Sequence, residues 1–189
     1  YEGTVDHVNP KIAYIKVPSL PDDVWVKSKD LNFAMHGDTV TIQIMSAAKA
    51  SQRPQGRVIS IVKRAKNEFV GRLEVSQKFG FVVLDSRNIF FDVMVYPQKF
   101  KEATHNDKVL VKIDKWPNKE NKSPLGSITH VLGQAGENNT EIHAIMAEYG
   151  LPFEFSKKVE AAAALIPVAI SKEEINERKD FRKEVTFTI

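Results

Sequence analysis

The chain has 189 residues, with 27 lysines and arginines against 24 aspartates and glutamates, and it contains no cysteine. Hydrophobic residues make up 42% and charged residues 27%, which is typical of a globular protein rather than a disordered one. The lack of cysteine excludes disulfides and thiolate zinc sites and fits a reducing, cytoplasmic compartment. No stretch reaches the roughly 18 to 20 uncharged apolar residues of a membrane span, so no membrane partner is expected.

Charge is distributed unevenly along the chain. Residues 1–72 carry a net charge of +4, residues 73–133 carry +2, and residues 134–189 carry −3. Basic surface attracts phosphate and accelerates encounter with nucleic acid. A surplus of this size is also common in proteins that bind no nucleic acid, so charge alone does not decide the function.

An internal repeat organises the front two-thirds of the chain. Four blocks recur in the same order, and they pair 1–3 with 69–71, 13–15 with 80–82, 34–40 with 103–109, and 54–58 with 124–128. The offsets are 68, 67, 69 and 70 residues. Blocks in constant order at a nearly constant offset predict two copies of one small domain, residues 1–66 and 67–133.

Each copy is expected to be a small β-barrel. Apolar and aromatic residues alternate along short runs, and turn-forming Asp, Asn, Gly and Pro separate the runs. Five short strands in about 65 residues indicate a Greek-key barrel of the OB type, with an SH3-like barrel as the structural alternative. The predicted fold class is mainly β: two tandem five-stranded barrels, then a short helical segment and a terminal strand.

The most informative pattern lies in the second copy, where K-F-G-F-V at residues 78–82 is followed by D-V-M-V-Y at residues 92–96. Strand alternation places the two phenylalanines on one face of their strand, and the methionine and tyrosine on one face of the next. If these faces coincide, they form a platform on which bases stack with little sequence preference. The alternative is that the rings fill the barrel. The candidate RNA-binding residues are Lys78, Phe79, Phe81, Met94 and Tyr96.

The first copy carries a weaker version of this pattern. The matching positions are Ile12, Tyr14, Trp25 and Lys27. Because Ile12 replaces an aromatic residue, we expect the first copy to bind RNA more loosely or to act as a spacer. Its candidate RNA-binding residues are Tyr14, Trp25 and Lys27.

Three helices are expected after residue 133. The first begins near Thr140, the second follows a cap at Ser156, and the third begins at Ser171 with a capping box. The first helix is expected to carry Ile142, Ile145, Met146 and Tyr149 on one face.

A strand is expected at the end of the chain. Residues 185–189 alternate as V-T-F-T-I, and a lone strand of this kind needs sheet partners. We therefore expect the chain to end inside a third domain, which occupies residues 134–189.

The chain as a whole resembles the N-terminal part of the RNase II family of 3′→5′ exoribonucleases. The runs at 78–82 and 92–96 resemble the two RNA-binding strand motifs of cold-shock domains. D-F-R at 180–182 with T-F-T-I at 186–189 resembles the entry to the family's catalytic domain. The resemblance implies a single-stranded RNA partner, and a catalytic domain beyond residue 189 that holds Mg²⁺ with clustered aspartates. Ile12 and Met94 depart from the family pattern, which has aromatic residues there.

No catalytic residue and no metal ligand is therefore expected within this chain. The densest acidic cluster is interpreted as a solvated helix start that the helix dipole favours; it consists of Glu173, Glu174, Glu177 and Asp180. No phosphate-binding G-x-x-x-x-G-K-[ST] loop and no G-x-S-x-G elbow occurs, and no small-molecule cofactor is expected. Two other functions stay open: a free-standing tandem cold-shock RNA chaperone, and an OB-fold protein-interaction module.

Overall fold

The computed structural model describes residues 1–46, 53–86, 89, 91–118 and 123–187. The chain forms two compact units, Tyr1–Leu151 and Pro152–Ile189. Within the described residues, no helix combines the length and the apolar character that a membrane crossing requires.

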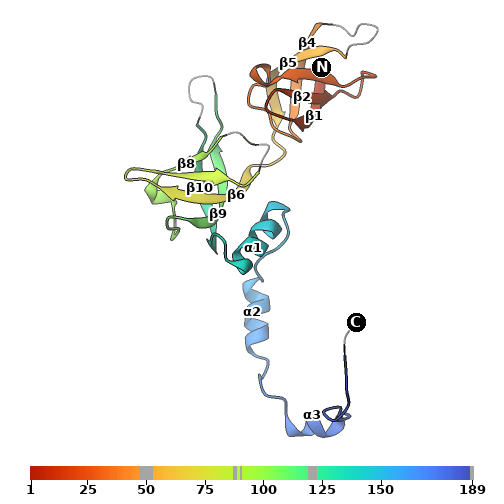
Figure 1. Ribbon diagram of the computed structural model, residues 1–189, viewed down its shortest axis with the longest axis vertical. Coiled ribbons are helices and arrows are strands. Elements are labelled where there is room, and N and C mark those ends of the chain that lie inside the picture. Colours follow the sequence, from red (N-terminus) through yellow and green to blue (C-terminus); the bar gives the residue numbers. More distant parts are fainter. Residues whose placement is uncertain (47–52, 87–88, 90, 119–122, 188–189) are drawn as a thin grey trace. The chain divides into compact units, whose positions relative to one another are not determined.

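The first unit begins with a closed barrel of five strands (Figure 1). Its order is β1-β2-β3-β5-β4, in which only the β3–β5 pairing is parallel. Alternate residues of each strand point inward, so valines, isoleucines and alanines fill the interior. The elements are β1 (Glu2–Val8), β2 (Ile12–Lys16), β3 (Val24–Lys27), the 3-10 helix η1 (Ser28–Asp30), β4 (Thr39–Ser46) and β5 (Gln55–Lys63).

A second closed barrel repeats this topology with the order β10-β8-β7-β6-β9. The β8–β10 pairing is again parallel and the others are antiparallel. The predicted fold class of two tandem five-stranded barrels is confirmed. The elements are β6 (Glu68–Val75), β7 (Gly80–Leu84), β8 (Val93–Val95), the 3-10 helix η2 (Pro97–Lys99), β9 (Asp107–Lys115) and β10 (Leu125–Gln134).

A glycine at matching positions lets each barrel close. A Cβ on Gly56 would lie 2.7 Å from Cγ1 of Val24, and one on Gly126 would lie 2.6 Å from Cγ1 of Val93. Any larger residue would push β5 away from β3, or β10 away from β8. Because these glycines point inward, their neighbours Gln55 and Leu125 lie on the outer surface.

A buried ion pair fixes the chain where it leaves the first barrel. Asp38 is fully buried, and its carboxylate accepts hydrogen bonds from Arg64 Nη1 at 2.7 Å and from the Ala65 amide at 2.9 Å. Arg64 also donates to the Phe33 carbonyl at 2.8 Å, and its Cζ lies 3.8 Å from the ring centroid of Trp116. Burial lowers the pKa of Arg64, while Asp38 opposes that shift.

Helix α1 (Asn138–Glu148) packs against the second barrel through small side chains. Thr140, Ala144 and Ala147 are the buried residues of this helix. The buried face is therefore not the apolar face seen in the sequence, because small side chains allow closer approach to the barrel than the larger ones would. The predicted face includes Ile142, Ile145 and Tyr149, which are 47%, 60% and 78% exposed, and Met146, which is half-buried.

Ion pairs add to the packing of α1. Lys108 Nζ lies 2.8 Å from a carboxylate oxygen of Asp85 and 3.4 Å from one of Glu141. Since α1 belongs to the same compact unit as the barrels, we propose that the second domain extends to Leu151 instead of ending at residue 133.

The second unit contains two short helices, α2 (Lys157–Ala164) and α3 (Lys172–Glu177). Ser156 and Ser171 cap them as predicted, since each side-chain oxygen accepts a hydrogen bond from a first-turn amide. Every described residue of this unit except Phe153 is exposed, so its described part has no core of its own.

The expected terminal strand is not formed in the described residues. Residues 185–187 have no strand pairing, and Thr188 and Ile189 lie outside the described residues. A strand requires a hydrogen-bonded neighbour, and alternation of side chains alone cannot supply one.

Candidate nucleic-acid interface

The outer surface of the second barrel brings the predicted aromatic residues together. Phe81 of β7 lies directly opposite Met94 of β8, while the alternating Val82 and Val93 are fully buried. The ring of Phe79 meets that of Phe81 edge to face, with centroids 5.3 Å apart. The two strand faces therefore coincide on the outside of the barrel, and valines supply the filling inside.

The remaining predicted residues flank this pair. Tyr96 follows β8 and is 42% exposed, and the register extended by one residue places it opposite Phe79. Lys78 is exposed in the turn between β6 and β7. Sequence reasoning missed Leu125, which lies beside Met94 on β10. We call Phe79, Phe81, Met94 and Tyr96 the second platform.

The first barrel repeats the arrangement at the matching positions. Tyr14 of β2 lies directly opposite Trp25 of β3, and Ile12 lies opposite Lys27. Trp25 pairs in turn with Gln55 of β5 in the parallel register. Both rings are half-buried, between fully buried neighbours that face the core. We call Tyr14 and Trp25 the first platform.

Two cations lie over the rings of the first platform. Arg53 Cζ is 5.2 Å from the centroid of Tyr14, and Lys27 Nζ is 5.9 Å from that of Trp25. Both distances are within the range of cation–π attraction. Arg53 also lies 3.9 Å from a carboxylate oxygen of Asp23. Sequence reasoning missed Arg53, although its place two residues before the repeated start of β5 was a usable signal.

The residues that border the platforms give them different electrostatic environments. His7 lies opposite Tyr14 on the outer side of the first platform. The matching partner of Phe81 is Glu74, whose carboxylate binds Arg72 Nη2 at 2.8 Å. The first platform therefore has two cations over its rings, with Asp23 beside one of them, whereas the second has the Glu74–Arg72 ion pair at its edge.

The described residues do not fit a magnesium site. No three of their histidines, aspartates and glutamates come together as metal ligands. In the acidic cluster near α3, Glu174 forms an ion pair with Arg178, and Asp180 forms one with Arg182 at 2.8 Å. Hydrogen bonds from Arg182 lower the pKa of Asp180, which reflects local ion pairing on an exposed surface.

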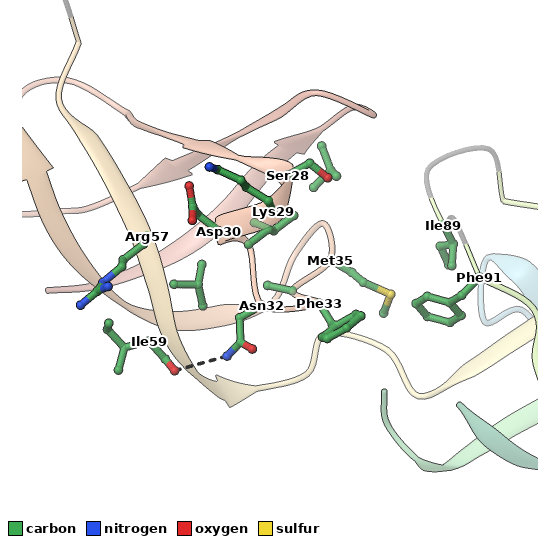
Figure 2. Close-up of a pocket in the computed structure, with 14 residues that line it drawn as sticks. Ser28, Lys29, Asp30, Asn32, Phe33, Met35, Arg57, Ile59, Ile89 and Phe91 are labelled. Atoms are coloured by element: carbon green, nitrogen blue, oxygen red, sulfur yellow. Dashed lines mark hydrogen bonds between the residues drawn. The ribbon is translucent and has the colours of Figure 1, made fainter. Parts of the chain in front are cut away.

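A separate pocket of about 950 Å³ is lined mainly by residues 28–35 and 57–59 of the first barrel (Figure 2). Asn32 and Ile59 line this pocket, and Asn32 Nδ2 donates to the Ile59 carbonyl at 3.3 Å. Asn32 and Phe33 both have positive φ angles, of 51° and 59°. None of the platform residues lines this pocket, so it does not belong to the candidate interface.

Comparison with known proteins finds two family models that match parts of the chain. Residues 81–156 match the family described as cold shock domain, and residues 13–61 match the one described as ribonuclease B OB domain. Ribonuclease R of Thermotoga maritima is 29% identical over 189 residues, which cover 99% of this chain and 26% of that protein. The chain is similar, along nearly its whole length, to part of ribonuclease R. Ribonuclease R of Escherichia coli is 24% identical, with 100% of this chain and 23% of that protein covered.

Solved structures show the same fold. Mycoplasma genitalium RNase R, in complex with ribose-methylated single-stranded RNA, matches with a TM-score of 0.74 at 23% identity, over 94% of this chain and 28% of that one. Yeast Ssd1, a pseudonuclease, matches with a TM-score of 0.64 at 18% identity, over 94% of this chain and 29% of that one. The chain spans about a quarter of the length of the ribonuclease R relatives.

Proposed function

We propose that this chain is the RNA-binding part of an RNase R-like 3′→5′ exoribonuclease, which captures single-stranded RNA and guides it to a catalytic domain outside this chain. The observation that carries the proposal is the repeated outward pair, Tyr14 with Trp25 and Phe81 with Met94. Homology to ribonuclease R along nearly the whole chain supports it. The Mycoplasma relative with single-stranded RNA in its structure points to the same ligand class.

Binding would combine base stacking with neutralisation of the backbone. Exposed rings offer faces to any base, at about 1–3 kcal/mol per base, and cations beside them contact phosphates. Two tethered platforms raise the apparent affinity through effective concentration. The groups that would contact RNA are Lys78, Phe79, Phe81, Met94 and Tyr96 in the second barrel, and Tyr14, Trp25, Lys27 and Arg53 in the first.

Two observations support an at least equal share of the RNA binding for the first barrel, which the sequence indicates to be the weaker one. Its two rings are direct cross-strand partners, and each already attracts a cation. A base that stacks on Tyr14 would displace Arg53 from the ring and leave its guanidinium near the adjoining phosphate. The loss of an aromatic at Ile12 is offset by Lys27 directly opposite.

The catalytic step would depend on residues outside this chain. In the proposed parent protein, Mg²⁺ would serve hydrolysis of RNA phosphodiesters, and the described residues of this chain would supply none of its ligands. The fold alone does not imply hydrolysis, because it also occurs in Ssd1, a pseudonuclease. We further propose that the parent is a cytoplasmic bacterial protein that acts without a small-molecule cofactor.

Incubation of the purified chain with 3′-labelled RNA and Mg²⁺ tests whether the chain binds RNA without hydrolysing it. We expect RNA binding without release of mononucleotides. Processive release from the 3′ end would contradict the proposal that the active site lies elsewhere. The encoded sequence that follows Ile189 provides a second test: an aspartate-rich run supports the exoribonuclease, and a stop codon supports the free-standing RNA chaperone.

A further inference from the structure

We propose that Gln55 reads the edge of an adenine that stacks on the first platform, so that base preference resides in the first barrel alone. The inference rests on the proposed RNA-binding function. Gln55 begins β5 and pairs with Trp25 in the parallel register. The amide of Trp25 donates to the carbonyl of Pro54 at 3.0 Å, which fixes the backbone beside Gln55. A base on the Trp25 ring would therefore have Gln55 at its edge.

Gln55 faces outward and its side-chain amide is free among the described residues. Gly56, the next residue, faces the core against Val24, so alternation places Gln55 on the outer surface, where it is half-buried. Gln43 of the same barrel, by contrast, accepts two hydrogen bonds from Arg57. A half-buried amide beside two aromatic rings has donor and acceptor capacity that a ligand could use.

The side-chain carboxamide is complementary to the N6/N7 edge of adenine. Its oxygen accepts and its NH₂ donates, which matches the N6 amino group and the N7 acceptor of adenine in a bidentate pair. Trp25 and Tyr14 would hold the base plane while Gln55 reads its edge. Arg53 and Lys27 would contact the flanking phosphates, which carry no sequence information.

The second platform lacks this capacity at the matching position. Leu125 lies beside Met94 where Gln55 lies beside Trp25. A leucine side chain neither donates nor accepts hydrogen bonds, and the surrounding Phe79 and Phe81 offer only faces and edges of rings. The second platform would then stack any base, while the first would discriminate.

Atom substitution in the RNA tests this reading directly. The ligand is an oligouridylate with one central adenosine, compared with the same RNA that carries 7-deazaadenosine or a purine without the 6-amino group. Measurements use the full chain with Phe81→Ala, which weakens the second platform. We expect either atom change to weaken binding about three- to tenfold, as for the loss of a hydrogen bond of ordinary strength. With Gln55→Leu, the three RNAs should bind equally.

Two further variants separate the possible failures. Gln43→Leu removes an exposed glutamine from the same barrel and should retain the three- to tenfold discrimination. Trp25→Ala should weaken binding of all three RNAs and reduce the difference among them, because it removes the ring that holds the base beside Gln55. If Gln55→Leu discriminates as strongly as the parent while Trp25→Ala loses affinity, the base-reading role is wrong and RNA binding stands. If Trp25→Ala leaves every affinity unchanged, RNA binding by this barrel is wrong as well. Thermal unfolding of each variant identifies any loss of folding.

Discussion

Tyr14 and Trp25 lie directly opposite one another on antiparallel strands, with both rings on the outside of the first barrel. Phe81 and Met94 repeat this relationship in the second barrel. Directly opposed residues have Cβ atoms about 4.5–5.5 Å apart, so each pair forms one continuous surface. The repeat thus preserves an outward platform in both barrels, along with the closed topology.

Trp25→Ala should weaken binding of single-stranded RNA by about 5- to 150-fold, because it removes the stacking of one base, about 1–3 kcal/mol. Trp25→Phe keeps an aromatic face and should retain most of the affinity. Fluorescence anisotropy with a labelled oligonucleotide measures both. Equal losses for the two variants would show that stacking is not what Trp25 contributes.

Lys27→Gln should reduce the salt dependence of RNA binding. Loss of one phosphate contact to a single strand lowers the slope of log K against log salt concentration by about 0.7. The matched control is Lys99→Gln, because Lys99 already pairs with Asp114 at 2.5 Å. Titrations at several salt concentrations measure the slopes. An unchanged slope for Lys27→Gln would remove that lysine from the interface.

Asp38→Ala should destabilise the protein by about 3–5 kcal/mol, because it leaves Arg64 without its buried partner. The control is Asp6→Ala, which breaks an exposed ion pair with Lys16 and should change stability by less than about 1 kcal/mol. Urea unfolding measures both free energies. A similarly small loss of unfolding free energy for both variants would show that the ion pair between Asp38 and Arg64 does not stabilise the chain where it leaves the first barrel.

Glu141 should make the attachment of α1 sensitive to acid. A hydrogen bond from the Gly136 amide and the charge of Lys108 lower the pKa of Glu141. Its stabilisation is therefore complete above the ordinary pKa of 4.5 and is lost as the pH falls through the lowered value. The effect should stay below about 1 kcal/mol, because the side chain is 42% exposed.

Unfolding midpoints between pH 3 and pH 7 measure this dependence. Glu141→Gln should be less stable than the parent at pH 7, and the difference should vanish in acid. Glu102→Gln, at an exposed position of the second barrel, should follow the parent at every pH. A constant deficit for Glu141→Gln across the range would contradict the assigned role of the carboxylate.

Much of the local structure follows from the sequence, because its causes lie within a few residues. The serine caps at Ser156 and Ser171 need only an amide three residues ahead. The side of β7 on which Phe81 lies follows from alternation. Because the same sequence blocks recur in the same order, the repeat predicts one topology for both barrels.

The features that sequence reasoning missed depend on distant partners. Helix α1 packs against the barrel through Ala144 and Ala147, because their small side chains let the helix approach the barrel surface closely. Arg53 reaches Tyr14 from a position 39 residues further along the chain. The repeat marks the position of Arg53, but only the packed fold brings each of these groups to its partner.

Titration of the chain with labelled single-stranded RNA most directly tests the claim that the two platforms bind RNA. The comparison uses the parent, a Tyr14→Ala/Phe81→Ala double variant, and Tyr149→Ala, which removes an exposed tyrosine directly after α1. The account predicts salt-sensitive binding by the parent and by Tyr149→Ala, and at least a 25-fold loss for the double variant, from two stacks of about 1 kcal/mol or more each. Equal affinity for all three proteins would contradict it.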